Sequence, residues 1–300
     1  MRRLWIYGLL WLSVNSLMAQ HALEVGVRGG VASLLYKTEV ATPSVRENIG
    51  FDIAYNYISP YFVGWRIGVS ADYSVSSLKA TGYEDAYDCT DVEFDKMHVH
   101  YTMQRWQEKH RQIYVSIPLQ FSIGYKHFSF HVGPKIMLPV LFGFEEEAIH
   151  VDLQCSYPDY QSTVTQALAL AAGDRALQTR EGKVVAHPKL WCAVSAELGY
   201  SWILTKHHAL RLSIYADVAI NQYNLTKTDN ISAIMLTDTR YTIPVERQLE
   251  TMFYANHHLK DKQVVESYRY LAAGIKLTWR FRIKDVSKYN KLCNCYPDEL

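Results

Sequence analysis

The chain has 300 residues and a formal net charge of +1, from 31 basic and 30 acidic side chains. This balance gives no reason to expect a nucleic-acid partner. Mean hydropathy is slightly negative, and after residue 20 no uninterrupted apolar run is long enough to form a spanning helix. The composition therefore argues against a bundle of membrane helices.

Residues 1–19 are predicted to be a secretory signal peptide. Arg2 and Arg3 begin the segment, an apolar core follows at 4–12, and Ala19 precedes the expected cleavage site. The apolar run is shorter than the ~18–20 residues that a spanning helix needs, so a retained anchor is the weaker alternative. We expect an exported protein.

Eight segments alternate between apolar residues and small or polar residues. Alternation with a period of two predicts β-strands, because successive side chains point to opposite faces. In chain order the segments span residues 23–36, 47–58, 61–78, the two arms of a hairpin within 112–142, 188–204, 209–225 and 267–283. Most are longer than the 5–6 residues of an ordinary strand. Long strands with one apolar row fit a membrane-spanning barrel.

The connections between these strands alternate in length. Turns of a few residues follow the second, fourth and sixth strands, whereas long inserts occupy about 79–110, 143–187 and 226–265. Short periplasmic turns and long external loops are typical of transmembrane barrels. Within the second insert, an Ala- and Leu-rich stretch at about 159–178 is a candidate helix.

We therefore predict an all-β fold, an antiparallel up-and-down transmembrane β-barrel of eight strands with long external loops. The barrel would occupy residues 20–284, and residues 285–300 would form a periplasmic tail. Ten strands are the alternative, if an insert contributes a further hairpin. The expected location is the outer membrane, because only helices and closed barrels satisfy every backbone group in lipid.

A soluble lipocalin-like barrel is the competing fold, and it would place the apolar row inside. Here the small and charged row holds most of the glycines, which suits a crowded interior, while the aromatic row suits lipid. Tyrosine is abundant, at 22 residues, as expected at membrane–water interfaces. We expect a periplasmic aromatic girdle of Tyr57, Trp65, Tyr125, Trp202, Trp279 and Phe281, and an outer one near Tyr36, Tyr73 and Phe142.

The inward rows bring charged residues of both signs into the predicted lumen. They are Glu24, Arg28, Asp52, Arg66, Asp72, Lys135, Glu197, Arg211, Asp217, Lys276 and Arg280. Side chains fill the interior of an eight-stranded barrel, and buried charges must be paired. We predict a structural network of ion pairs; the alternative is a narrow polar pore.

Histidines and cysteines supply weaker signals. The histidine pairs at 98/100, 207/208 and 257/258 lack the Cys/His spacing of a structural zinc site. We expect no metal and no other cofactor. Cys89 and Cys155 lie in two predicted external inserts, in an oxidising compartment, and are a candidate disulfide.

The central hairpin resembles the PorT-like outer-membrane β-barrel family of Bacteroidota. The shared features are Ile117-Pro118-Leu119, the short turn, and Gly133-Pro134-Lys135 in the return strand. The opening segment at 24–30 and the end of the signal peptide, Ala19-Gln20, are also similar. The resemblance covers the strands, about half the chain, and implies an outer-membrane barrel; some relatives serve in protein secretion. The long inserts match no pattern of this family.

Three classes of function remain open at this stage. We favour a non-enzymatic role in surface binding, assembly or secretion support through the long inserts, because loops of this length are usually functional or disordered. Outer-membrane lipid and a protein or glycan would be the partners of a monomeric barrel. The alternatives are a narrow channel and a lipid-modifying enzyme using Ser76, Ser77, His98 and His100 near the external rim, although no motif ties these four together.

Overall fold

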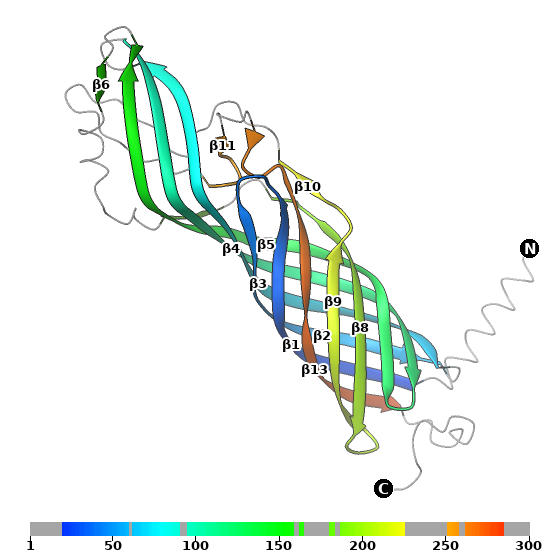
Figure 1. Ribbon diagram of the computed structural model, residues 1–300. Coiled ribbons are helices and arrows are strands. Elements are labelled where there is room, and N and C mark those ends of the chain that lie inside the picture. Colours follow the sequence, from blue (N-terminus) through cyan, green and yellow to red (C-terminus); the bar gives the residue numbers. More distant parts are fainter. Residues whose placement is uncertain are drawn as a thin grey trace, which may run out of the picture.

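Eight strands form a closed antiparallel ring. The computed structural model describes residues 20–59, 62–90, 95–158, 162–164, 180–183, 187–225, 251–257 and 262–284. The ring contains β1 (Gln20–Lys37), β2 (Thr42–Ile58), β3 (Val63–Thr90), β4 (Lys96–Tyr125), β5 (Phe128–Tyr157), β8 (Trp191–Ile203), β9 (His208–Ala219) and β13 (Ser267–Lys284). Each strand pairs with its neighbour in this order, and β1 closes the ring by pairing with β13 along its length. The predicted eight-stranded barrel is confirmed (Figure 1).

The remaining strands are short and add nothing to the ring. Among the described residues, β6 (Ser162–Val164) and β7 (Arg180–Lys183) pair with β5, β10 (Tyr223–Asn224) pairs with β13, and β11 (Asn256–His257) pairs with β12 (Lys262–Gln263). The ten-stranded alternative is therefore wrong. The candidate helix at 159–178 is wrong for residues 162–164, which form β6, and its other residues lie outside the described part. The predicted signal peptide and tail also lie outside it.

The apolar row of the barrel faces outward and the polar row faces inward. Ile49 is 62% exposed and Ile214 61%, whereas the alternating Asp52 and Ser213 are buried. A soluble lipocalin would show the reverse, because its apolar residues line the interior. The exposed apolar wall belongs to a transmembrane barrel, in which lipid covers these side chains. No helix of the described residues is long and apolar enough to cross a membrane.

Aromatic side chains cluster at the end of the barrel that carries the short turns. Trp65, Trp202 and Trp279 are exposed there, with Tyr57 stacked on Trp65 at a ring separation of 5.8 Å. The predicted aromatic girdle at the short-turn end is therefore confirmed, and its periplasmic side stays a prediction. The outer girdle is partly wrong, because Tyr73 is exposed but Tyr36 and Phe142 are buried inside.

A β-bulge explains the error at Phe142. Ile113 pairs with Leu141 but Tyr114 pairs with Pro139, so β5 contains one extra residue at this point. Val140 and Leu141 are consequently both exposed, at 67% and 42%, and the residues that follow change face. A bulge reverses the inward and outward assignment of every later residue in its strand.

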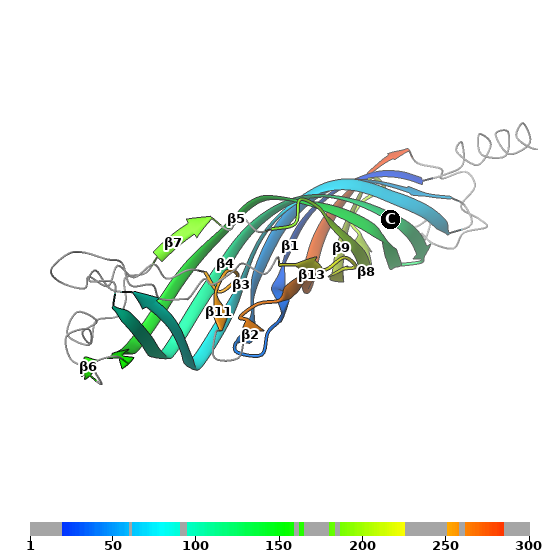
Figure 2. The same ribbon diagram turned by 90° about the horizontal axis from the view of Figure 1, so that it is seen from above.

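Three neighbouring strands continue far beyond the barrel. We call residues 80–90 of β3, 96–106 of β4 and 148–157 of β5 the projecting sheet, since β2 makes its last pair with β3 at Lys79. Figures 1 and 2 show these strands extending to one side of the barrel, with β6 near their far end. The first two inserts were predicted as loops, and this is wrong for most of their described residues.

The projecting sheet forms because one of its faces is apolar. Val99, Tyr101, Met103 and Trp106 of β4 are fully buried, as is Tyr83 of β3. They share a core with residues 251–257 and with Val264 and Val265. Among the residues whose side chains the structure describes, no large apolar side chain is exposed between positions 74 and 112 or between 142 and 189. The lipid-facing wall therefore ends where the projecting sheet begins.

Candidate functional site

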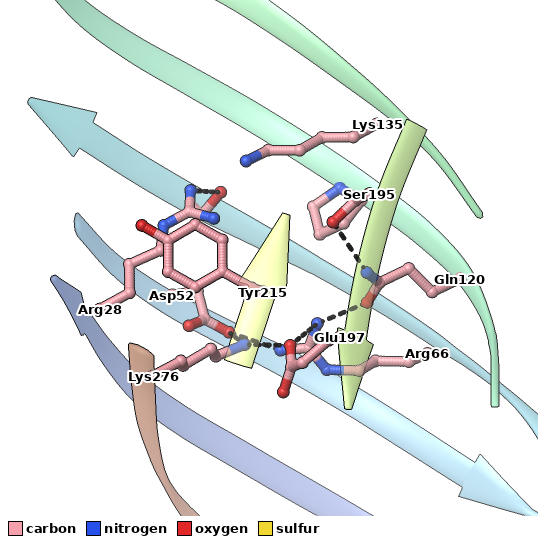
Figure 3. A pocket seen from close by; sticks show the side chains of 11 residues that line it. Arg28, Asp52, Arg66, Gln120, Lys135, Ser195, Glu197, Tyr215 and Lys276 are labelled. Atoms are coloured by element: carbon pink, nitrogen blue, oxygen red, sulfur yellow. Dashed lines mark hydrogen bonds and ion pairs between the residues drawn. The ribbon is translucent and has the colours of Figure 1, made fainter. Parts of the chain in front are cut away.

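A continuous network of buried ion pairs occupies the barrel interior. All eleven residues predicted for the lumen are at most 9% exposed. Each makes at least one ion pair with another member of the set. Figure 3 shows Arg66, Glu197, Lys276 and Asp52, which come from four different strands, converging near the centre. The network joins strands that are not neighbours in the ring.

Glu24 of β1 is the most heavily paired carboxylate of this network. It accepts hydrogen bonds from Arg66 Nε at 2.8 Å, Arg211 Nη2 at 3.2 Å and Arg280 Nε at 2.9 Å. Asn56 Nδ2 donates a fourth bond at 2.9 Å. Several charge-assisted bonds to one buried carboxylate compensate for its lost hydration.

Glu197 of β8 and Asp52 of β2 extend this centre to further strands. Glu197 accepts from Arg211 Nη2 at 2.6 Å and from Lys276 Nζ at 3.0 Å. Lys276 Nζ also lies 3.0 Å from Asp52 Oδ2, which accepts from Arg66 Nη2 at 2.5 Å. Each cation here therefore bridges two carboxylates.

A second group of charges lies nearer the outer end of the lumen. Lys135 Nζ donates to Asp217 Oδ2 at 2.7 Å, and Arg28 pairs with both Asp72 and Asp217. Gly50 makes room for this group, since a Cβ atom there would overlap the Asp72 carboxylate. The small residues of the inward rows are thus needed to accommodate long charged side chains.

His131 belongs to the network but was not predicted as a member. Arg211 Nη1 donates to His131 Nε2 at 2.7 Å, so the Nδ1–H group donates to Ser122 Oγ at 2.7 Å. This pattern requires a neutral imidazole with its proton on Nδ1. The usable signal was its position, because His131 shares the inward row of β5 with Lys135.

The lumen has little free space beside these side chains. The cavity bordered by Arg28, Arg66, Lys135 and Lys276 has room for about one water molecule. Six cationic groups face five carboxylates in the network, so the enclosed excess is a single positive charge. The arrangement can fasten the barrel wall and obstruct the passage of solutes.

A hydrogen-bonded chain at the outer mouth was also missed by the sequence analysis. Tyr36 OH lies 2.9 Å from Ser76 Oγ and 2.5 Å from His110 Nδ1, and His110 Nε2 bonds to Glu108. Glu108 Oε2 accepts from the backbone N–H of Met252 at 2.7 Å. The chain thus links strands β1, β3 and β4 to the segment before β11.

We call residues 251–257 the mouth segment. The Phe253 ring lies 4.4 Å from the His110 ring and 5.1 Å from that of Tyr268, centroid to centroid. Tyr83 OH donates to Asn256 O at 3.0 Å. Burial raises the pKa of Tyr83, and the nearby Tyr101 and Asp85 raise it further, so its hydroxyl stays protonated. The mouth segment is therefore packed against buried side chains at this end of the barrel.

The four residues proposed for an enzyme do not come together. Ser76 and Ser77 are buried, and Ser76 lies opposite His110 in the sheet. His98 lies opposite Asp88, twelve residues further along β3, or about 40 Å at 3.3 Å per residue. Ser76 therefore has no hydrogen-bond contact with either predicted histidine.

The other candidate sites give limited information. No group of three or more His, Cys, Asp or Glu side chains in the described residues could hold a metal ion. Cys155 is buried on β5, and β4 runs between its strand and β3, which carries Cys89. The side chain of Cys89 lies outside the described part, so the disulfide stays a prediction.

Comparison with known proteins finds distant structural similarity and no particular family. No protein-family model matches the chain, and no curated protein matches it in sequence. PorT-like membership therefore rests on the sequence resemblance alone. In architecture this protein is an eight-stranded antiparallel β-barrel of the transmembrane type, as its closed ring and exposed apolar wall show.

Three solved structures illustrate this similarity. Ail, the attachment invasion locus protein of Yersinia pestis, is 7% identical with a TM-score of 0.29, covering 87% of this chain and 99% of its own. Neisserial surface protein A is 10% identical with a TM-score of 0.28 and the same coverage. OprG of Pseudomonas aeruginosa is 10% identical with a TM-score of 0.27, covering 88% and 98%.

Proposed function

We propose that this protein is a non-enzymatic outer-membrane barrel that binds a protein or glycan at the cell surface through its projecting sheet. One observation carries the proposal: three adjacent strands of 28 to 30 residues extend past the membrane wall as one sheet. A strand of about 10 residues is enough to span a membrane. The extra length has no role in crossing the bilayer, and it presents a stiff polar surface to the exterior.

The interior of the barrel supports this role over the two alternatives. A filled lumen disfavours a channel, since permeation needs a continuous polar path. The separation of Ser76 from His98 disfavours the predicted enzyme, because catalysis needs nucleophile and base within hydrogen-bond reach. The PorT-like resemblance adds assembly or secretion support as the process that such binding would serve.

Shortening the projecting sheet tests the proposal. Thr81 pairs with Arg105, and Arg105 pairs with Ile149, so these three residues form one row across the sheet. The shortened variant replaces 82–104 with an Asn-Gly turn and lacks 150–179. It therefore keeps the strand pairing between this row and the barrel. Asn-Gly suits a two-residue hairpin. The barrel should still fold, as judged by its heat-dependent mobility in gels. Binding to glycan arrays and crosslinking to surface partners should be lost.

A control variant changes two surface charges far from the projecting sheet without shortening it. Lys126 and Lys206 lie exposed in turns at the opposite end of the barrel, and their replacement by Gln should leave partner binding unchanged. Full retention of binding by the shortened protein would contradict the proposal and assign the sheet to covering the barrel mouth.

A further inference from the structure

Three basic side chains lie together on the outward surface at the base of the projecting sheet. We call Arg46 of β2 and Lys109 and Arg111 of β4 the basic cluster. The side chains of Arg111 and Lys109 are 46% and 40% exposed, whereas their neighbours His110 and Gln112 point inward and are buried. The cluster is therefore separate from the lumen network.

Lys109 and Arg111 lie directly above the lipid-facing wall, and Arg46 lies next to Val45, the last exposed apolar side chain of β2. Ile113 is 36% exposed and pairs with Tyr73 and Leu141, which are 40% and 42% exposed. These three are the last exposed apolar side chains of their strands in the described residues. Arg111 lies two residues beyond Ile113, and Lys109 four, or about 7 and 13 Å along the strand. This is the level at which the hydrocarbon region gives way to headgroups.

The cluster converges on one point of the wall from two strands. Ser77 of β3 pairs with Lys109, and Arg46 Nε donates to Ser77 Oγ at 3.4 Å from the other side. A β-bulge between Val45 and Asn48 falls at Arg46. Strands β2 and β4 lie about 10 Å apart across β3, so long basic side chains from both can reach a single group above Ser77.

The cluster carries more positive charge than its neighbours neutralise. One carboxylate, Glu145, serves both Lys109, at 3.6 Å, and Arg111. The contact of Arg46 is to a neutral hydroxyl, and it forms no ion pair with a carboxylate of the described residues. Among the side chains that the structure describes, two carboxylates, Glu145 and the exposed Glu47, lie beside these three cations. An anion is the chemistry that would complete this surface.

We propose that the basic cluster binds the phosphate group of an outer-leaflet lipid. Guanidinium groups match the geometry of phosphate oxygens and bind them through paired hydrogen bonds. The apolar wall at Tyr73, Ile113 and Leu141 lies immediately below, where the acyl chains of the same lipid would run. This continuity with the lipid-facing wall favours a phospholipid or phosphorylated glycolipid over a free phosphate ion.

The test measures lipid binding by native mass spectrometry of the full protein in uncharged detergent, with diphosphoryl lipid A as the probe. The double variant Arg46→Gln/Arg111→Gln should bind about 25-fold more weakly, at roughly fivefold for each juxtamembrane cation removed. Glu145→Gln removes the competing carboxylate and should strengthen binding severalfold. Misfolding would weaken lipid binding in every variant, so weaker binding by the Arg46/Arg111 variant together with stronger binding by the Glu145 variant would exclude misfolding as the cause.

The control variant Lys126→Gln/Lys206→Gln removes two charges from turns at the opposite end and should leave binding unchanged. The same lipid without its phosphates should bind as weakly as the Arg46/Arg111 variant. The proposal would be overturned if both double variants lost lipid affinity equally. It would also be overturned if the lipid bound equally well with and without its phosphates. Displacement by equimolar inorganic phosphate would assign the cluster to a free anion and overturn the lipid assignment. Neither result bears on partner binding by the projecting sheet.

Discussion

Glu24 shows how a single residue holds several strands of the barrel together. Its carboxylate is fully buried and bonds to Arg66, Arg211 and Arg280, which come from β3, β9 and β13. A buried ion pair costs much of its Coulomb energy in desolvation, so its net contribution is small while it is intact. Removing one partner is strongly destabilising, because the remaining charges stay buried without compensation.

Glu24→Gln is therefore expected to lower the free energy of unfolding by about 3 kcal/mol. Urea unfolding in lipid vesicles, followed by tryptophan fluorescence, measures this change. Glu266→Gln is the matched control, since Glu266 pairs with Lys37 at 2.5 Å on the surface, where both side chains are well exposed. Solvent screens that pair, and its loss should have little effect. Equal effects of the two changes would show that the network adds no particular stability.

At the scale of elements, the mouth segment depends on contacts from distant strands. Glu108 of β4 accepts a hydrogen bond from the Met252 N–H and bonds to His110, while Phe253 packs against the His110 ring. Among the described residues, its backbone-to-backbone bonds to the rest of the chain are those of Val264 N–H to Ala255 O and its short pairing with β12. Its position thus relies on side chains of the barrel wall.

Glu108→Ala should loosen the mouth segment without unfolding the barrel. Leaving the Met252 N–H and His110 Nε2 unpaired in a buried site costs about 2 kcal/mol, which corresponds to roughly thirtyfold faster amide exchange over 251–257. Hydrogen exchange with mass spectrometry measures this. Glu84→Ala, on the exposed face of the projecting sheet, should leave exchange at 251–257 as it was. Unaltered exchange in the Glu108 variant would contradict the assigned role.

The projecting sheet has an apolar core of its own, and Trp106 is its largest fully buried side chain. Its ring contacts Tyr83 edge to face at 5.5 Å. Trp106→Ala should cost about 3–5 kcal/mol by leaving a cavity, and proteases should then cleave within 80–106 while the barrel stays intact. Gln104→Ala, at an exposed position of the same strand, should resist cleavage like the unmodified protein. Resistance of both variants would show that the sheet does not depend on this core.

At the scale of the whole molecule, the lumen network fills the barrel and the mouth segment packs at its outer end. We expect no stepwise conductance from the protein in planar bilayers. Replacing 226–265 by a short turn removes the mouth segment but leaves the charged side chains in the lumen, so this variant should also remain closed. Stable single-channel steps from the unmodified protein would contradict a filled lumen. Steps from the shortened variant alone would assign closure to the mouth segment.

Local alternation was enough to predict the barrel, because inward and outward faces follow directly from a period of two. The charged lumen residues share one parity in each strand, and the contrast between row compositions separated lipid-facing from interior residues. The same rule would have extended β4, since Met97, Val99, Tyr101 and Met103 alternate with polar residues. The polar residues between them, which are rich in His, Thr and Gln, led to the prediction of a loop instead.

Tertiary structure alone decided what these rows contact. The bulge in β5 reversed the face of Phe142, and no local pattern signals an extra residue in a ladder. Glu108, His110 and Met252 meet only because the chain returns across the barrel mouth after more than a hundred residues. The sequence by itself determined which side chains point inward, through the geometry of the strand. Which of them meet depended on strand register and closure, since these set distances between residues far apart in the chain.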